Sequence, residues 1–277
     1  MTMWNLKKPE GFDARAHLDT VFSDGELTEA EKTSLLALYD DYVASKGRPT
    51  AALRREGLRP QLYTLVHAAY KHVQDNGRLK QLRADLKLLA NYCPYCGFAP
   101  ISDLDHHLQR AHFKLLSIYA LNLVPSCGPC NGGKRRVPSN DPEQHQIHTY
   151  LEQLADFDFL RAAVTLNPGT GALAVQYSVV QCEGMSDELH KRLVYHLTEF
   201  KLHDKYKRQV NIHLGEQEAA LTSAFEGGPE VLRSLLVKTS EANKKRFGTN
   251  DWRTALFRGL AACPQFWSGG FKTALGL

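Results

Sequence analysis

Four cysteines have the types and spacing of a metal site. They form two CxxC pairs, Cys93 with Cys96 and Cys127 with Cys130. Each CxxC turn presents two sulfur atoms to one ion, and Zn²⁺ binds four thiolates tetrahedrally, so two such turns make a closed structural zinc site. Two disulfides or four unrelated buried cysteines are the alternatives. Thiol redox chemistry would need one motif beside a βαβ pattern and not a matched second pair.

The residues between and after the two pairs could carry out hydrolysis. Residues 101–107 (ISDLDHH) and 122–126 (NLVPS) predict two strands, and residues 128–136 (GPCNGGKRR) predict the first turns of a helix. Asp105 offers a carboxylate oxygen and Asn131 an amide oxygen, which suit Mg²⁺ or Mn²⁺ better than zinc. With only two protein ligands, the other coordination positions of the ion would be free for water and phosphate. His106 titrates near neutrality and could take a proton from an attacking water.

Residues 93–136 resemble the HNH endonuclease family, also called His-Me finger or ββα-metal nucleases. The resemblance rests on CPYC, LDHH, NL and CGPCN followed by Lys134. It implies that Asp105 and Asn131 hold the catalytic ion, that His106 is the general base, and that Asn122 braces the loop that orients His106. The ion would then assist in-line attack on a phosphodiester. Lys134, with Arg135 and Arg136, would lie one helical turn beyond the ion and grip flanking phosphates.

Two alternatives to this assignment stay open. Many family members have a proline a few residues after the histidine, whereas this chain runs HHLQRAHF. A register one residue on would make His106 the ligand and His107 the base. A second alternative is an inert copy, because a fold and its zinc could persist without chemistry.

Charge favours a polyanionic substrate locally more than globally. The net charge of the 277 residues is only +4, which would not by itself suggest nucleic acid. Between His106 and Asn140, however, the chain has no acidic residue. A solvated basic loop would explain any one of the cations there, but together they predict a phosphate track. The predicted nucleic-acid contacts are Arg110, Lys114, Lys134, Arg135 and Arg136.

Composition indicates a soluble globular protein of one large or two small domains, with 43% hydrophobic residues. No run of about 18 apolar residues could span a membrane, and MTMWNLKKPEGFD lacks the apolar core of a signal peptide. Thiolate zinc ligands favour a reducing compartment. We therefore expect a cytoplasmic protein without a membrane partner.

The flanks predict a mostly α fold with a small ββα-metal core and one extra β-hairpin, α+β overall. Residues 1–90 are expected to be helical, with a capping box at Thr28 and Glu31 and further helices over residues 60–75 and 78–90. Residues 91–140 form the predicted nuclease core. Residues 141–277 are expected to hold a helix over 143–157, a β-hairpin over 159–180, a helix that starts after Ser186 and continues through residue 214, and helices over 229–245 and 251–262.

The helical lead ending in GRLKQLR and the form NLVPSCGPCN resemble a subgroup of HNH proteins from bacterial anti-phage systems. In those of Septu type, a small HNH protein works with a separate ATPase. This resemblance implies a defensive endonuclease, most readily one that cuts DNA, whose flanking helices dock a partner. A restriction or homing endonuclease is a variant of this hypothesis. The opposing hypothesis is a zinc-stabilised binding module, for nucleic acid or protein, with no catalysis.

Overall fold

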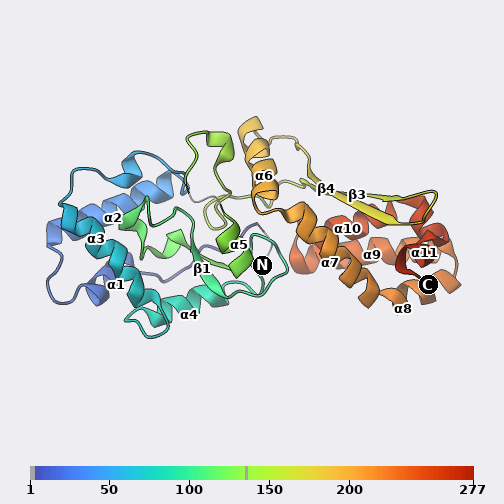
Figure 1. Cartoon of the computed structure of the whole chain (residues 1–277), viewed down its shortest axis with the longest axis horizontal. Coiled ribbons are helices and arrows are strands. Elements are labelled where there is room, and N and C mark those ends of the chain that lie inside the picture. The colour runs from blue at the N-terminus through green and yellow to red at the C-terminus, as the bar shows by residue number, and fades with distance from the viewer. Residues whose placement is uncertain (1–3, 135–136) are drawn as a thin grey trace. The chain divides into compact units, whose positions relative to one another are not determined.

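The computed structural model of the chain describes residues 4–134 and 137–277, which fall into two compact units, Trp4–Gln153 and Leu154–Leu277 (Figure 1). The described residues are mostly helical and contain two antiparallel sheets of two strands each. This composition confirms a mixed α+β class with a helical majority. The N-terminal helices and the cysteine-bearing segment, expected as separate regions, lie in one unit. Among the described residues, no helix is long and apolar enough to cross a membrane.

The first unit begins with helices that bury one apolar face. Those that precede the first cysteine pair are α1 (Ala14–Val21), α2 (Glu29–Ala44), α3 (Pro60–Ala68) and α4 (Lys80–Leu88). The predicted capping box starts α2, because the Thr28 hydroxyl accepts from the Glu31 amide and the Glu31 carboxylate accepts from the Thr28 amide. The predicted helix over residues 60–75 is α-helical only to Ala68 and continues as the 3₁₀ helix η2 (Ala69–Val73).

The predicted order of strand, loop, strand and helix is confirmed. Strand β1 (Asp103–His106) pairs with the antiparallel strand β2 (Leu123–Ser126), with Asp103 opposite Ser126 and His106 opposite Leu123. The loop between them contains the 3₁₀ helices η3 (Lys114–Leu116) and η4 (Ala120–Asn122). Helix α5 (Gly128–Gly133) follows. It ends before Lys134, whose backbone is extended, so the helix is shorter than predicted.

The prediction of a helix over residues 143–157 is wrong. The 3₁₀ helix η5 (Pro142–Gln144) is followed by turns and extended backbone over residues 145–159. Contacts with the rest of the unit explain this, since the Tyr150 hydroxyl donates to the Leu123 carbonyl and the His148 ring lies 2.9 Å from the Tyr42 hydroxyl. These contacts hold the segment in a conformation that its apolar periodicity did not reveal.

The second unit contains the predicted hairpin, strands β3 (Leu160–Leu166) and β4 (Leu173–Val179), paired with Leu160 opposite Val179. The Ser186 hydroxyl caps the first helix after it, as predicted. That helix does not continue through residue 214, because Lys201 has φ +50° and separates α6 from α7. The helices of this unit are α6 (Asp187–Glu199), α7 (Leu202–Glu216), α8 (Glu218–Glu226), α9 (Pro229–Phe247), α10 (Trp252–Ala261), η6 (Phe266–Gly270) and α11 (Phe271–Leu275).

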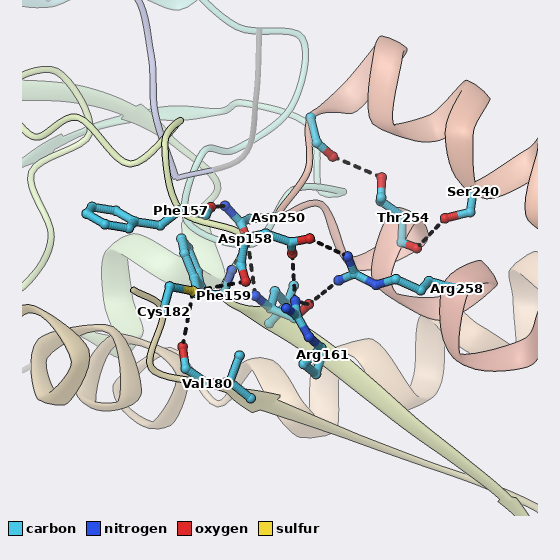
Figure 2. A network of polar contacts seen from close by, with 12 residues as sticks. Phe157, Asp158, Phe159, Arg161, Val180, Cys182, Ser240, Asn250, Thr254 and Arg258 are labelled. Atoms are coloured by element: carbon cyan, nitrogen blue, oxygen red, sulfur yellow. Dashed lines mark hydrogen bonds and ion pairs between the residues drawn. The ribbon is translucent and has the colours of Figure 1, made fainter. Parts of the chain in front are cut away.

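A polar network joins the start of β3 to α10 and to Asn250, which lies two residues before that helix (Figure 2). The Asn250 side-chain oxygen accepts from the amides of Phe159 and Leu160 at 2.8 and 3.1 Å, and its nitrogen donates to the Phe157 carbonyl. Arg258, on α10, donates to the Asp158 carboxylate at 2.7 Å and to the Leu160 carbonyl. The hairpin is thereby fixed to the helices by specific hydrogen bonds as well as by apolar packing.

Candidate functional site

The two CxxC pairs meet. The Sγ atoms of Cys93, Cys96, Cys127 and Cys130 all lie within 4.8 Å of one another, and all four residues are buried. The first pair lies on a turn in which the Gly97 amide donates to the Cys93 carbonyl, and the second lies at the start of α5, where the Cys130 amide donates to the Cys127 carbonyl. Hydrogen bonding by the neighbouring thiols, Cys130 foremost, lowers the pKa of Cys127.

This cluster can hold a metal ion such as zinc. With Zn–S bonds of about 2.3 Å, the sulfurs of a tetrahedral site lie about 3.8 Å apart, which is within the 4.8 Å limit on the distances between the four Sγ atoms. Four sulfur ligands would close the coordination shell, so an ion here would join the turn before β1 to helix α5 and would not bind substrate.

Asp105 is buried in β1 and faces two donors. Its Oδ2 atom accepts from the Tyr95 hydroxyl at 2.9 Å and from the Lys134 ammonium at 2.7 Å. Burial raises the pKa of Asp105, and Lys134 and then Tyr95 oppose this rise. Tyr95 had no predicted role, although its position inside the first CxxC motif placed it beside the cluster.

Lys134 does not reach outward as predicted. Its side chain is only 4% exposed, and besides Asp105 it donates to the carbonyls of His106 and His107 at 2.5 and 3.0 Å. In this position its charge balances Asp105 and is turned away from solvent. Arg135 and Arg136, predicted as further phosphate contacts, lie outside the described residues.

His106 stands at the end of β1, and its Nε2 atom lies 2.9 Å from the Ser117 carbonyl. The pKa of His106 is lowered to about 3, chiefly by burial and further by the charges of Arg110, Lys134 and His67, while the hydrogen bond to Ser117 opposes the shift. The ring is therefore neutral at pH 7. Because a carbonyl only accepts hydrogen bonds, Nε2 carries the proton and Nδ1 is the basic nitrogen.

Asn122 holds the loop that carries Ser117. Its side-chain oxygen accepts from the Leu108 amide at 2.7 Å and from the Tyr42 hydroxyl at 3.1 Å. Its side-chain nitrogen donates to the carbonyls of Leu108 and Leu116 at 3.0 and 3.2 Å. The residue is fully buried. These bonds fix both ends of the loop that follows His106.

His107, the second choice for the base, lies in a buried layer. Its ring is 4.2 Å from the His148 ring, centroid to centroid, and the residue is 6% exposed. Alternate residues of a strand point to opposite faces, so His107 shares the Asp105 face of β1 and its continuation while His106 takes the other. His106 therefore does not share the face of the strand on which His107 meets His148.

Basic groups gather on the His106 side. The Arg110 guanidinium lies 4.9 Å from the centre of the Tyr70 ring, which makes an edge contact with His106 at 4.4 Å. Burial lowers the pKa of His67, and the nearby charges of Arg110 and Lys114 lower it further. Arg110 and Lys114, two of the predicted phosphate contacts, thus lie close to His67. His67 and Tyr70, on helices far from the motif in sequence, had no signal that linked them to it.

The predicted ligands of a catalytic ion differ in accessibility. A catalytic Mg²⁺ keeps positions for water and substrate, but the Asp105 carboxylate is buried and paired with Lys134. Asn131 lies on α5 with a partly exposed side chain. As arranged, these two residues do not form an open site for a divalent ion.

The chain is similar to Protein ea31 of Escherichia phage lambda, with 27% identity over 190 residues. The match covers 64% of this chain and 64% of the relative, so the chain spans less than two thirds of that protein's length. No protein-family model and no solved structure matches the chain.

Proposed function

We propose that residues 93–134 are the core of an HNH-type endonuclease that hydrolyses phosphodiester bonds, most readily in DNA, with His106 as the general base. The observation that carries this proposal is the fixed tautomer of His106. Its Nε2–H is held by the Ser117 carbonyl, which leaves Nδ1 to accept a proton from water. The loop that supplies this carbonyl is fixed by Asn122.

The low pKa of His106 is a property of the free protein. Arg110, Lys134 and His67 are among its causes, and a bound phosphodiester would bring a negative charge against those cations. An anion near an imidazole favours its protonated form and raises its pKa. Substrate binding would therefore strengthen the base in the complex, where the proton must be accepted.

A catalytic Mg²⁺ or Mn²⁺ belongs to the proposal through the resemblance to HNH nucleases, and would stabilise the charge of the attacked phosphate when bound. Asp105 and Asn131 are the residues predicted to hold it. Asp105 is paired with Lys134 in this structure. The catalytic groups that the protein itself would supply are therefore His106, as the base, and Arg110 and Lys114, which would bind phosphate oxygens.

The test is cleavage of supercoiled and single-stranded DNA, and of RNA, by the zinc-loaded protein with Mg²⁺, with Mn²⁺ and with a chelator. His106→Gln keeps a donor for the Ser117 carbonyl but removes the base, and we expect a loss of about 10²- to 10⁴-fold in rate. His112→Gln is the matched control, since His112 is an exposed histidine of the same loop. Equal cleavage by wild type and His106→Gln would refute the assignment.

A second candidate is a zinc-stabilised binding module without catalysis. The Lys134–Asp105 ion pair favours it, because it closes the carboxylate that a catalytic ion would use. Absence of cleavage by the wild-type protein with every ion and nucleic acid tested, and with zinc bound, would support this candidate.

The biological role that we propose is defence of a bacterial cell against phage, with an ATPase as the protein partner and the cytoplasm as the location. The support is the second resemblance noted in the sequence. Expression in bacteria tests it. Plating efficiency of phage should fall when the wild-type chain is expressed together with an ATPase partner, and should be restored by His106→Gln.

A further inference from the structure

Lys134 occupies a position that resembles a cation site. Its Nζ atom is surrounded by Asp105 Oδ2 at 2.7 Å, the His106 carbonyl at 2.5 Å and the His107 carbonyl at 3.0 Å. An ammonium group has three hydrogens to donate, and each has an oxygen here. The two charged side chains are 4% and 5% exposed. The end of β1 is thus a buried cradle of three oxygens around one positive charge.

The same oxygens are suitable ligands for a hard divalent cation. Carboxylate and backbone carbonyl oxygens are what Mg²⁺, Mn²⁺ and Ca²⁺ prefer. Two cations cannot share the cradle, because at such short distances in a protein interior their repulsion amounts to several kcal/mol even at an effective dielectric constant of about 20. Occupation by Lys134 and by an ion is therefore mutually exclusive.

The chain before Lys134 is suited to a change of its position. Lys134 follows Gly132 and Gly133 at the end of α5, and both glycines are exposed. A Cβ atom built on either would meet no neighbour within 4 Å. Glycine has a wide choice of backbone conformations, so this junction can redirect the following side chain without disturbing the four cysteines.

We propose that Lys134 and a divalent cation compete for the cradle formed by Asp105 Oδ2 and the carbonyl oxygens of His106 and His107. Lys134 is the occupant of the free protein, and an ion enters only when Lys134 leaves. The proposal deepens the proposed function, because Asp105 belongs to the same core. Ion binding, however, can be measured without cleavage.

Binding of Mn²⁺ to the zinc-loaded full-length protein, followed by electron paramagnetic resonance, tests the competition. We expect Lys134→Met to bind one Mn²⁺ at least about tenfold more tightly than wild type, because the variant lacks the competing charge. The double variant Lys134→Met with Asp105→Asn should lose this gain. Lys80→Met is the matched control, since it removes an exposed lysine of α4 in the same unit and should leave Mn²⁺ affinity unchanged.

Lys134→Gln provides a second route if Lys134→Met does not fold, since an amide keeps hydrogen-bond donors without the charge. Its midpoint of thermal unfolding should rise with added Mn²⁺, whereas that of wild type should not. The proposal is overturned if wild type binds Mn²⁺ as tightly as these variants, or if Asp105→Asn leaves the gain intact. Failure of the proposed nuclease function would be detected separately, because DNA cleavage would then not depend on His106.

Discussion

The depressed pKa of His106 predicts a specific dependence of stability on pH. The pKa of His106 is about 3 in the folded protein, chiefly because the ring is buried, against 6.5 in the unfolded chain. Between these values the unfolded state binds one more proton than the folded state. The free energy of unfolding therefore falls as the pH is lowered through this window, and the contribution of His106 is fully favourable only above pH 6.5.

The expected magnitude follows from the linkage relation. One proton costs about 1.4 kcal/mol per pH unit, so His106 should reduce the free energy of unfolding by about 2 kcal/mol between pH 6.5 and pH 5. His106→Gln is the matched variant, because its amide can donate to the Ser117 carbonyl but does not titrate. The difference in stability between wild type and variant should shrink, or reverse, by this amount on acidification.

Urea unfolding followed by circular dichroism at a series of pH values measures this difference. Zinc binding is itself linked to protons, but both proteins have the same four cysteines, so that contribution cancels in the comparison. Parallel curves for the two proteins would refute the reasoning. They would mean that His106 titrates alike in both states and that its ring is not desolvated in the folded core.

Three further predictions concern other parts of the chain. Cys127→Ser should reduce bound zinc and destabilise the first unit by several kcal/mol, as measured by metal analysis and calorimetry; full zinc content in the variant would contradict the four-sulfur site. Asn122→Ala should cost about 2–4 kcal/mol, because it leaves buried loop groups without partners, and should slow any cleavage more than it weakens DNA binding; an unchanged rate would remove Asn122 from the positioning of His106. Asn250→Ala should cost about 2 kcal/mol in the second unit and speed amide exchange at Phe159 and Leu160; slow exchange at both amides would show that the network in Figure 2 is dispensable.

Much of the fold could be predicted from local patterns. The capping box at Thr28, the alternation in β3 and β4, and the short strands at Asp105 and Leu123 are features in which neighbouring residues determine the structure. The gathering of the four cysteines was also predictable, because the CxxC spacing encodes a shared ligand set. Each of these signals, including each CxxC pair taken by itself, lies within a few residues of the chain.

The remaining features depend on contacts between distant residues. Residues 143–157 were predicted to be helical, but contacts of His148 with Tyr42 and of Tyr150 with Leu123 hold this segment in another conformation. The sequence suggested that Lys134 is an exposed phosphate contact. Its partners, the Asp105 carboxylate and two backbone carbonyls, are far from it along the chain, although they touch it in the fold. A single buried ion pair leaves no periodic pattern in the sequence from which it could be predicted.

The charge distribution supports the proposal that a polyanion would bind on the His106 side of the core. Four thiolates around Zn²⁺ would carry a net charge of minus two, and the Lys134–Asp105 pair is neutral. His106 is uncharged at pH 7. Among the residues that the structure describes, Arg110 and Lys114 are cations on this side, and their charges lower the pKa of His67. A phosphate drawn to these two residues would lie on the same side of the core as His106, whose Nε2 atom contacts the Ser117 carbonyl, so attraction and proton acceptance would coincide on one face of the core.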